Sequence, residues 1–115
     1  MLAHGAVLRK NGFDGSQLVA IARDFHNAGL TPEEVALMSF AQKISTRANQ
    51  IGQPDLDDLQ GLGLSDEEIL DVVLACTARN FFSKTLDSLA AAPDEIYKDL
   101  EPALVQALTI GRPFP

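Results

Sequence analysis

The stretch that decides the fold reads LTPEEV and occupies residues 30–35 of this 115-residue chain. It has the chemistry of a helix start: the Thr31 hydroxyl can accept a hydrogen bond from an N–H group of the first turn, and Glu34 can return one to the cap. Pro32 suits the first helical position because it has no N–H and a fixed φ. Apolar residues then recur at helical spacing, which predicts a helix from this cap to about Arg47.

The same kind of cap recurs at LSDEEI, residues 64–69. Ser65 and Glu68 are its partners, and the pattern predicts a helix from Ser65 to about Ala91. This is the longest and most apolar of the predicted helices, so we expect it to be the central element of the fold. The sequences that follow the two caps do not align, which favours shared capping chemistry over an internal repeat. Its wide apolar surface includes Ile69, Val72, Val73, Cys76, Phe81, Leu86 and Leu89.

Glycine and proline divide the rest of the chain into further helices. We expect one from Leu2 to about Asn11, a second that is capped by Asp14 or Ser16 and ends at Gly29, and a short one after a loop over residues 49–55. Pro102 breaks the last helical segment, and residues 111–115 are expected to lie extended over a neighbouring element. No stretch alternates with the period of a strand, so the sequence predicts an all-α bundle of about five to six helices, in a single domain over residues 1–115.

The charge balance narrows the possible partners. Acidic residues outnumber basic ones by 16 to 9, which gives a net charge of −7 and argues against a nucleic-acid partner. No stretch approaches the roughly 20 apolar residues that span a bilayer, so we expect no membrane partner. Much of the acidic excess falls between positions 55 and 71, and we interpret it as the solvated starts of helices rather than as a cation site. These residues are Asp55, Asp57, Asp58, Asp66, Glu67, Glu68 and Asp71.

The apolar content points to self-association. A mean hydropathy of +0.05 is high for so small a chain, and the helix from Ser65 carries more apolar surface than one chain can bury. We therefore expect a homo-oligomer. The single cysteine excludes an internal disulfide and suits a reducing cytoplasm.

Few residues are candidates for a catalytic or binding role. Cys76 lies among apolar neighbours and is predicted to pack, and His26 is predicted to be an exposed residue at the end of the second helix. Asn80 has two interpretations: it faces solvent, or it hydrogen-bonds an adjacent loop or lines a pocket. His4 lies in the first stretch, MLAHGAVLRK, which reads as a helix but offers no Ser, Thr, Asp or Asn as a cap.

This first stretch resembles the second half of the active-site helix of the alkylhydroperoxidase D-like (AhpD-like) peroxidases, within the carboxymuconolactone decarboxylase superfamily. The resemblance continues in order along the chain and is greatest to a branch described as peroxidase-related proteins. Its segments are His4–Lys10, Leu30–Leu37, Gly63–Leu70, Ala78–Phe82 and Gly111–Pro113.

The resemblance implies hydroperoxide reduction by a Cys-x-x-Cys-x-x-x-His motif, in which His4 would be the proton-relay histidine. Both motif cysteines would then precede Met1, and the family's upstream acidic residue is also absent. We therefore expect an N-terminally truncated AhpD-like domain that cannot run a dithiol peroxidase cycle as this polypeptide. By analogy the reductant would be a small dithiol protein, and no cofactor or metal is implied.

Two alternatives stay open at this point. The chain could be a lyase or hydrolase like carboxymuconolactone decarboxylase, with His4 as general acid or base in a pocket between helices. It could also be a noncatalytic oligomeric helical scaffold that keeps the fold without the site.

Overall fold

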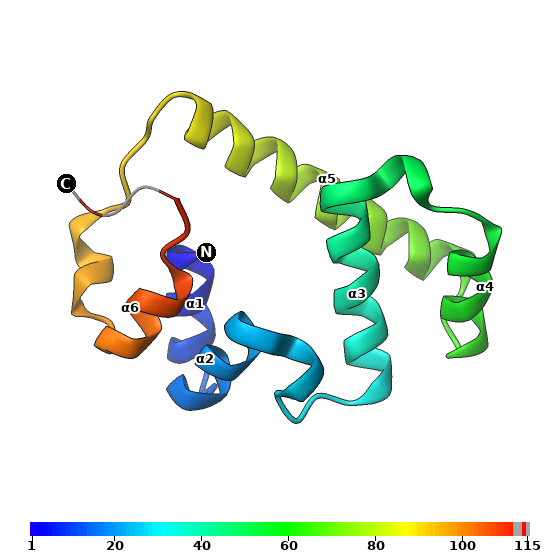
Figure 1. Ribbon diagram of the computed structural model, residues 1–115, viewed down its shortest axis with the longest axis horizontal. Coiled ribbons are helices and arrows are strands. Elements are labelled where there is room, and N and C mark those ends of the chain that lie inside the picture. The colour runs from blue at the N-terminus through cyan, green and yellow to red at the C-terminus, as the bar shows by residue number, and fades with distance from the viewer. Residues whose placement is uncertain (112–113, 115) are drawn as a thin grey trace. The chain divides into compact units, whose positions relative to one another are not determined.

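A computed structural model describes residues 1–111 and Phe114 (Figure 1). The described residues form helices and no strand, so the prediction of an all-α fold with about five to six helices is confirmed. Short 3₁₀ turns follow α2 and α3 and precede α6. The α-helices in this part of the chain are α1 (Leu2–Lys10), α2 (Gly15–Asp24), α3 (Pro32–Arg47), α4 (Gln53–Gly61), α5 (Asp66–Ser88) and α6 (Pro102–Leu108).

The chain divides into two compact units. The first unit combines Met1–Leu30 with the chain from Ala92 onward, and the second is Thr31–Ala91. Each unit has a hydrophobic core of its own. The expectation of a single domain over residues 1–115 stays a prediction.

The first unit joins the two ends of the sequence. Its α6 packs against both α1 and α2, and Leu104 is fully buried at the centre of this contact. The glycine at position 5 lets α1 approach α6 closely, because a Cβ there would overlap the side chain of Leu108. Gly12, with φ +94°, allows the chain to turn after α1 in the left-handed conformation that glycine adopts without strain. The buried residues of this core are Leu2, Leu18, Leu104 and Leu108.

The end of the chain adds to this core. Phe114 packs against it from a non-helical segment, and the Lys98 ammonium lies 5.3 Å from the centre of the Phe114 ring. Within the tail that was predicted to lie extended over a neighbouring element, Phe114 packs against this core, and Gly111 forms a bend with φ +80°. Arg112, Pro113 and Pro115 lie outside the described residues.

The second unit is built on the two predicted caps. Thr31 Oγ1 accepts a hydrogen bond from the Glu34 N–H at 3.2 Å, and the Glu34 carboxylate accepts one from the Thr31 N–H at 2.8 Å. Ser65 and Glu68 repeat this arrangement at 3.1 and 2.8 Å. Both capping boxes, and the helix starts that they predict, are confirmed. The core between α3, α4 and α5 contains Phe40, Ile44, Leu59 and Ile69.

Two helix boundaries differ from the prediction because of local hydrogen bonds. The second helix ends at Asp24, before Gly29, because the Asp24 carboxylate accepts hydrogen bonds from the His26 N–H at 3.1 Å and from Asn27 Nδ2 at 2.5 Å. These bonds favour a 3₁₀ turn over a further α-helical turn. The fourth helix begins within the predicted loop, at Gln53, because Asp55 Oδ2 accepts the Gly52 N–H at 2.8 Å and closes the first turn.

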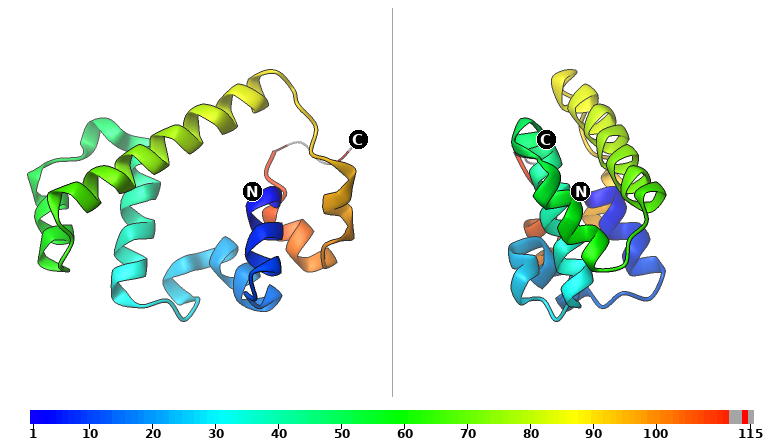
Figure 2. Two further views of the ribbon diagram at one scale, coloured as in Figure 1. Left: turned by 180° about the vertical axis from the view of Figure 1, so that it is seen from behind. Right: turned by 90° about the vertical axis from the view of Figure 1, so that its right-hand side faces the viewer.

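The prediction that the long helix is the central element is wrong. Within the second unit, α5 packs against α3 and α4 through its first part, where Ile69 is buried. From Phe81 to Ala90 every residue is exposed. Figure 2 shows the second half of α5 continuing past α3, with neither α3 nor α4 beside it. The apolar residues of this half, which sequence periodicity assigned to a core, are therefore not covered by α3 or α4.

Candidate functional site

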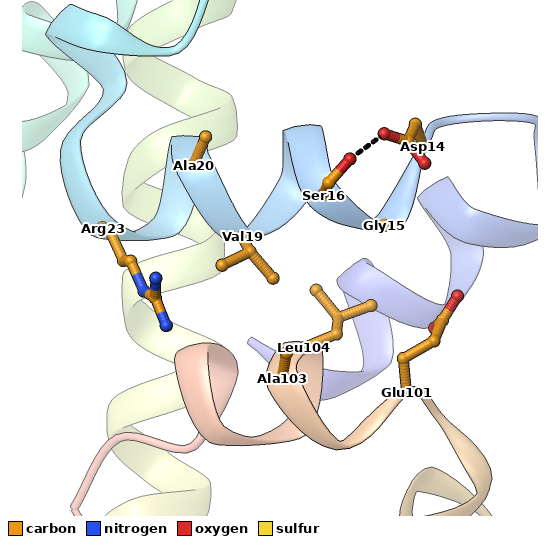
Figure 3. Close-up of a pocket in the computed structure, with 9 residues that line it drawn as sticks. All are labelled: Asp14, Gly15, Ser16, Val19, Ala20, Arg23, Glu101, Ala103 and Leu104. Carbon is orange, nitrogen blue, oxygen red and sulfur yellow. Dashed lines mark hydrogen bonds between the residues drawn. The ribbon is translucent and has the colours of Figure 1, made fainter.

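A groove in the first unit lies between α2 and α6 (Figure 3). Its volume is about 480 Å³. One wall comes from α2 and its cap, and the other comes from the start of α6. The lining residues are Asp14, Gly15, Ser16, Val19, Ala20, Arg23, Glu101, Ala103 and Leu104.

The groove has an apolar middle and charged ends. Figure 3 shows Val19 facing Leu104 across its centre, with Arg23 at one end and with Asp14 and Glu101 at the other. Leu104 belongs to the buried core, and Val19 packs against that core. The groove is therefore a shallow extension of the core surface, with a cationic end and an anionic end.

An ion pair fixes the anionic end. Glu101 Oε1 lies 2.7 Å from Arg9 Nε and 2.6 Å from Arg9 Nη2, and Arg9 Nη1 donates to the Phe13 carbonyl at 3.0 Å. A Cβ at position 15 would lie 3.1 Å from Glu101 Oε1 and 3.2 Å from Arg9 Nε, which is closer than an ordinary contact. A larger residue there would therefore require the ion pair to shift by a few tenths of an ångström.

Both carboxyl groups of this end favour their ionised forms. The hydrogen bond from Arg9 is the largest cause that lowers the pKa of Glu101. The hydroxyl of Ser16 donates to Asp14 Oδ2 and is the largest cause that lowers the pKa of Asp14. Because a general acid at neutral pH needs a raised pKa, neither group suits acid catalysis.

His4 does not line this groove. It is exposed on the first turn of α1, next to Gly5, which is buried against α6. The structure thus places the predicted relay histidine on the solvent side of α1. Its role in proton relay or in acid–base catalysis stays a prediction.

Cys76 packs as predicted. It is half-buried against the core of the second unit, and burial raises the pKa of its thiol. A raised pKa keeps the group in the thiol form at neutral pH, whereas the thiolate is the nucleophile. The chain has no second cysteine with which it could form a disulfide.

His26 and Asn80 have local structural partners. His26 is exposed, as predicted; its Nδ1 lies 3.2 Å from Asp24 Oδ1 and its ring stacks on Phe25 with centroids 4.2 Å apart. Asn80 Nδ2 donates to Ser45 Oγ at 2.8 Å. Of its two interpretations, the structure favours the hydrogen bond, although the acceptor lies on α3 rather than in a loop.

Four of the seven acidic residues between positions 55 and 71 lie in the first turns of helices, as predicted, and Asp57, Asp58 and Asp71 lie further along α4 and α5. Asp55 closes the first turn of α4 and pairs with Lys43 at 2.6 Å, and residues 66–68 form the first turn of α5. Within the described part of the chain, no group of three or more His, Cys, Asp or Glu side chains is arranged to hold a metal ion. None of the helices described here has both the length and the apolar character that a membrane crossing requires.

Sequence reasoning missed the groove because its walls come from distant segments. Arg9 and Glu101 are 92 positions apart, and no local pattern links them. The one available signal was Gly15 in the first turn of a helix, where a glycine without a turn suggests a close approach.

The comparisons with known proteins add no relative. The chain matches no protein-family model, no curated protein and no solved structure. The AhpD-like resemblance therefore depends on the quoted residue patterns, and it stays a prediction.

Proposed function

We propose that this chain is a peroxidase-related protein of the AhpD-like group that does not reduce hydroperoxides as this polypeptide. The ordered resemblance of segments from His4–Lys10 to Gly111–Pro113 supports the group. Two of these segments contain the caps at Thr31 and Ser65, which start α3 and α5. Under this proposal the protein is a cytoplasmic homo-oligomer, and a small dithiol protein is the reductant of any active form.

One observation carries the lack of activity: the single thiol is half-buried and has a raised pKa. In a dithiol peroxidase a thiolate attacks the O–O bond, which leaves a sulfenic acid and an alcohol. A second thiol then condenses with the sulfenic acid to form a disulfide and water, and an external dithiol reduces that disulfide. Cys76 is a poor nucleophile for the first step, and the second step has no thiol.

The test adds the two motif cysteines to the chain. The 115-residue chain and a chain extended by Cys-x-x-Cys directly before Met1 are compared for reduction of an organic hydroperoxide, with excess dithiothreitol as reductant. In the extended chain His4 is the motif histidine, because three residues separate it from the second added cysteine. We expect no turnover above background from the natural chain and measurable turnover from the extended chain.

The controls separate motif chemistry from nonspecific thiol reactivity. The extended chain with both added cysteines replaced by serine is expected to be inactive. His4→Ala in the extended chain is expected to lower the rate about 100-fold or more, as for the loss of a proton-transfer group. A folded extended chain with titratable thiols and no turnover would contradict the AhpD-like proposal, and turnover by the natural chain would contradict the inactive state.

A second candidate is a noncatalytic helical scaffold, and the exposed apolar residues of α5 favour it. It predicts that the folded extended chain is also inactive. The lyase or hydrolase alternative has no comparable support, because His4 does not line the groove between α2 and α6.

A further inference from the structure

The groove between α2 and α6 is formed within the first unit alone, because all its lining residues belong to that unit. Its volume of about 480 Å³ falls within the range of roughly 300–1,000 Å³ that ligand sites occupy. Val19 and Leu104 form its apolar middle, and charged side chains lie beyond this middle at both ends (Figure 3). A ligand that fills the groove therefore meets charge at both of its own ends.

The anionic end has one negative charge that no cation of the chain balances. Asp14 and Glu101 contribute two carboxylates, and one guanidinium, that of Arg9, contacts Glu101 Oε1. Hydrogen bonds lower the pKa of both carboxyl groups, so both are ionised at neutral pH. A carboxylate can accept about four hydrogen bonds, so each group can take a further donor. This end therefore suits a ligand group with a single positive charge.

The cationic end consists of Arg23. Within the part of the chain that the structure describes, Arg23 donates no hydrogen bond and forms no ion pair. The adjacent carboxylate, Asp24, lies outside the lining of the groove and accepts hydrogen bonds from His26 and Asn27. The planar guanidinium of arginine can bind a carboxylate through two parallel hydrogen bonds. This end therefore suits a ligand group with a single negative charge.

The two ends are separated by the length of a short peptide. Asp14 is the N-cap of α2 and Arg23 is in its last turn, so a rise of about 1.5 Å per residue places them about 14 Å apart along the helix. An extended chain spans about 3.3–3.6 Å per residue, so four residues cover about the same distance. At neutral pH a peptide with free termini carries an ammonium at one end and a carboxylate at the other.

We propose that the groove binds an apolar peptide of about four residues by its two termini. The N-terminal ammonium lies between Asp14 and Glu101, and the C-terminal carboxylate pairs with Arg23. An apolar side chain of the peptide packs on Val19 and Leu104. Because the two ends of the groove have opposite charge, they fix the direction of the peptide. The groove is shallow, so the peptide backbone stays in contact with water and needs few partners from the protein.

A fatty-acid-like carboxylate is the main competing ligand, because it could also pair with Arg23. Its hydrocarbon end would lie beside the two carboxylates of the anionic end. There it would displace water without offering a hydrogen bond in return, which is unfavourable. A ligand with charge at both ends avoids this cost, so the comparison of the two ligands tests the proposal.

The first test titrates the isotope-labelled 115-residue chain with the tetrapeptide Ala-Leu-Leu-Ala and follows the backbone amides by nuclear magnetic resonance. We expect saturable shifts at Val19 and Ala103, with a dissociation constant below about 1 mM. N-acetylation or C-amidation of the peptide is expected to weaken binding about threefold or more, because each removes one charge pair. Octanoate, the fatty-acid probe, is expected to bind more weakly than the peptide.

The second test assigns each terminus to its end of the groove. Arg23→Gln is expected to weaken binding of the free peptide about threefold or more, and to abolish the effect of C-amidation but not that of N-acetylation. Asp14→Asn is expected to abolish the effect of N-acetylation alone, and asparagine keeps the helix cap. The matched controls are Arg47→Gln and Asp58→Asn, which remove the same charges from exposed positions of the second unit.

Four results would overturn the proposal. They are the absence of saturable shifts at millimolar peptide, equal binding of the acetylated or amidated peptide, octanoate binding as tight as that of the peptide, and equal effects of Arg23→Gln and Arg47→Gln. The amide spectrum of each variant shows whether it is folded. Neither His4 nor Cys76 lines the groove, so this test and that of hydroperoxide reduction fail separately.

Discussion

Gly5 of α1 lies directly against the side chain of Leu108 of α6, and no Cβ can be accommodated between them without movement. Leu108 is itself buried in the core of the first unit, so it has little freedom to withdraw. This contact fixes how closely the first and last helices of the chain approach.

Gly5→Ala is therefore expected to destabilise the fold. Overpacking a core costs about 1–3 kcal/mol, and this exceeds the roughly 1 kcal/mol that alanine gains over glycine within a helix. Urea unfolding is expected to show a net loss of about 1 kcal/mol. Gly61→Ala in α4 is the matched control, because a Cβ there meets no atom within 4 Å. If Gly5→Ala is as stable as the unsubstituted chain, or more stable, the close approach of α1 to α6 is contradicted.

The two capping boxes are expected to contribute similarly to stability. Thr31→Ala and Ser65→Ala each remove the acceptor of a first-turn N–H, which costs about 1 kcal/mol. Thermal and urea unfolding measure the loss. Ser83→Ala is the control, since Ser83 is an exposed serine in the interior of α5 and no cap depends on it. Equal stability of Ser65→Ala and Ser83→Ala would show that the cap does not contribute.

The Arg9–Glu101 ion pair predicts a pH dependence. Because the folded state lowers the pKa of Glu101 below its usual value of 4.5, the ionised carboxylate stabilises the folded chain above that pH. This stabilisation is lost as the pH falls through the lowered pKa. Nuclear magnetic resonance titration of the Glu101 side chain is expected to give a midpoint below 4.5 in the natural chain and a higher midpoint in Arg9→Gln.

Lys10→Gln is the control for this titration, because it removes the same charge from the neighbouring position. It is expected to leave the midpoint of Glu101 low, since the hydrogen bonds from Arg9 remain. An equal shift in both variants would mean that net charge, rather than the ion pair, sets the pKa of Glu101.

The Cys76 thiol is expected to react slowly. Burial raises its pKa above the usual 9.0, so the rate of alkylation by iodoacetamide should reach half its maximum above pH 9. Ala78→Cys in a Cys76→Ala background provides an exposed thiol on the same helix for comparison, measured under reducing conditions at low concentration. Faster alkylation of Cys76 than of this reference at pH 7 would contradict the packed position.

The sequence predicts those parts of the fold that depend on hydrogen bonds between residues close together in the chain. The caps at Thr31 and Ser65 need only neighbouring residues, and both form as expected. The end of α2 was misplaced because the Asp24 carboxylate competes for the N–H of His26, which helical periodicity does not report.

Contacts between distant segments could not be predicted in this way. The groove between α2 and α6, the Arg9–Glu101 pair and the approach of Gly5 to Leu108 all join residues from opposite ends of the sequence. Helical periodicity shows that a residue lies on an apolar face of a helix, but it does not show whether another element covers that face. Periodicity therefore predicts burial for both Ile69 and Phe81, although Ile69 is buried and Phe81 is 75% exposed.

Leu2, Leu104 and Leu108 lie in one core although they come from opposite ends of the chain, and this affects folding during synthesis. During translation, α1 and α2 leave the ribosome long before α6, so their apolar sides stay unpaired until α6 has been synthesised. The segment Thr31–Ala91 contains all the partners of its own core and can fold while the ribosome is still adding residues. The segment Thr31–Ala91 is thus expected to fold before the first unit does, and α1 and α2 are expected to be accessible to chaperones until α6 has been made.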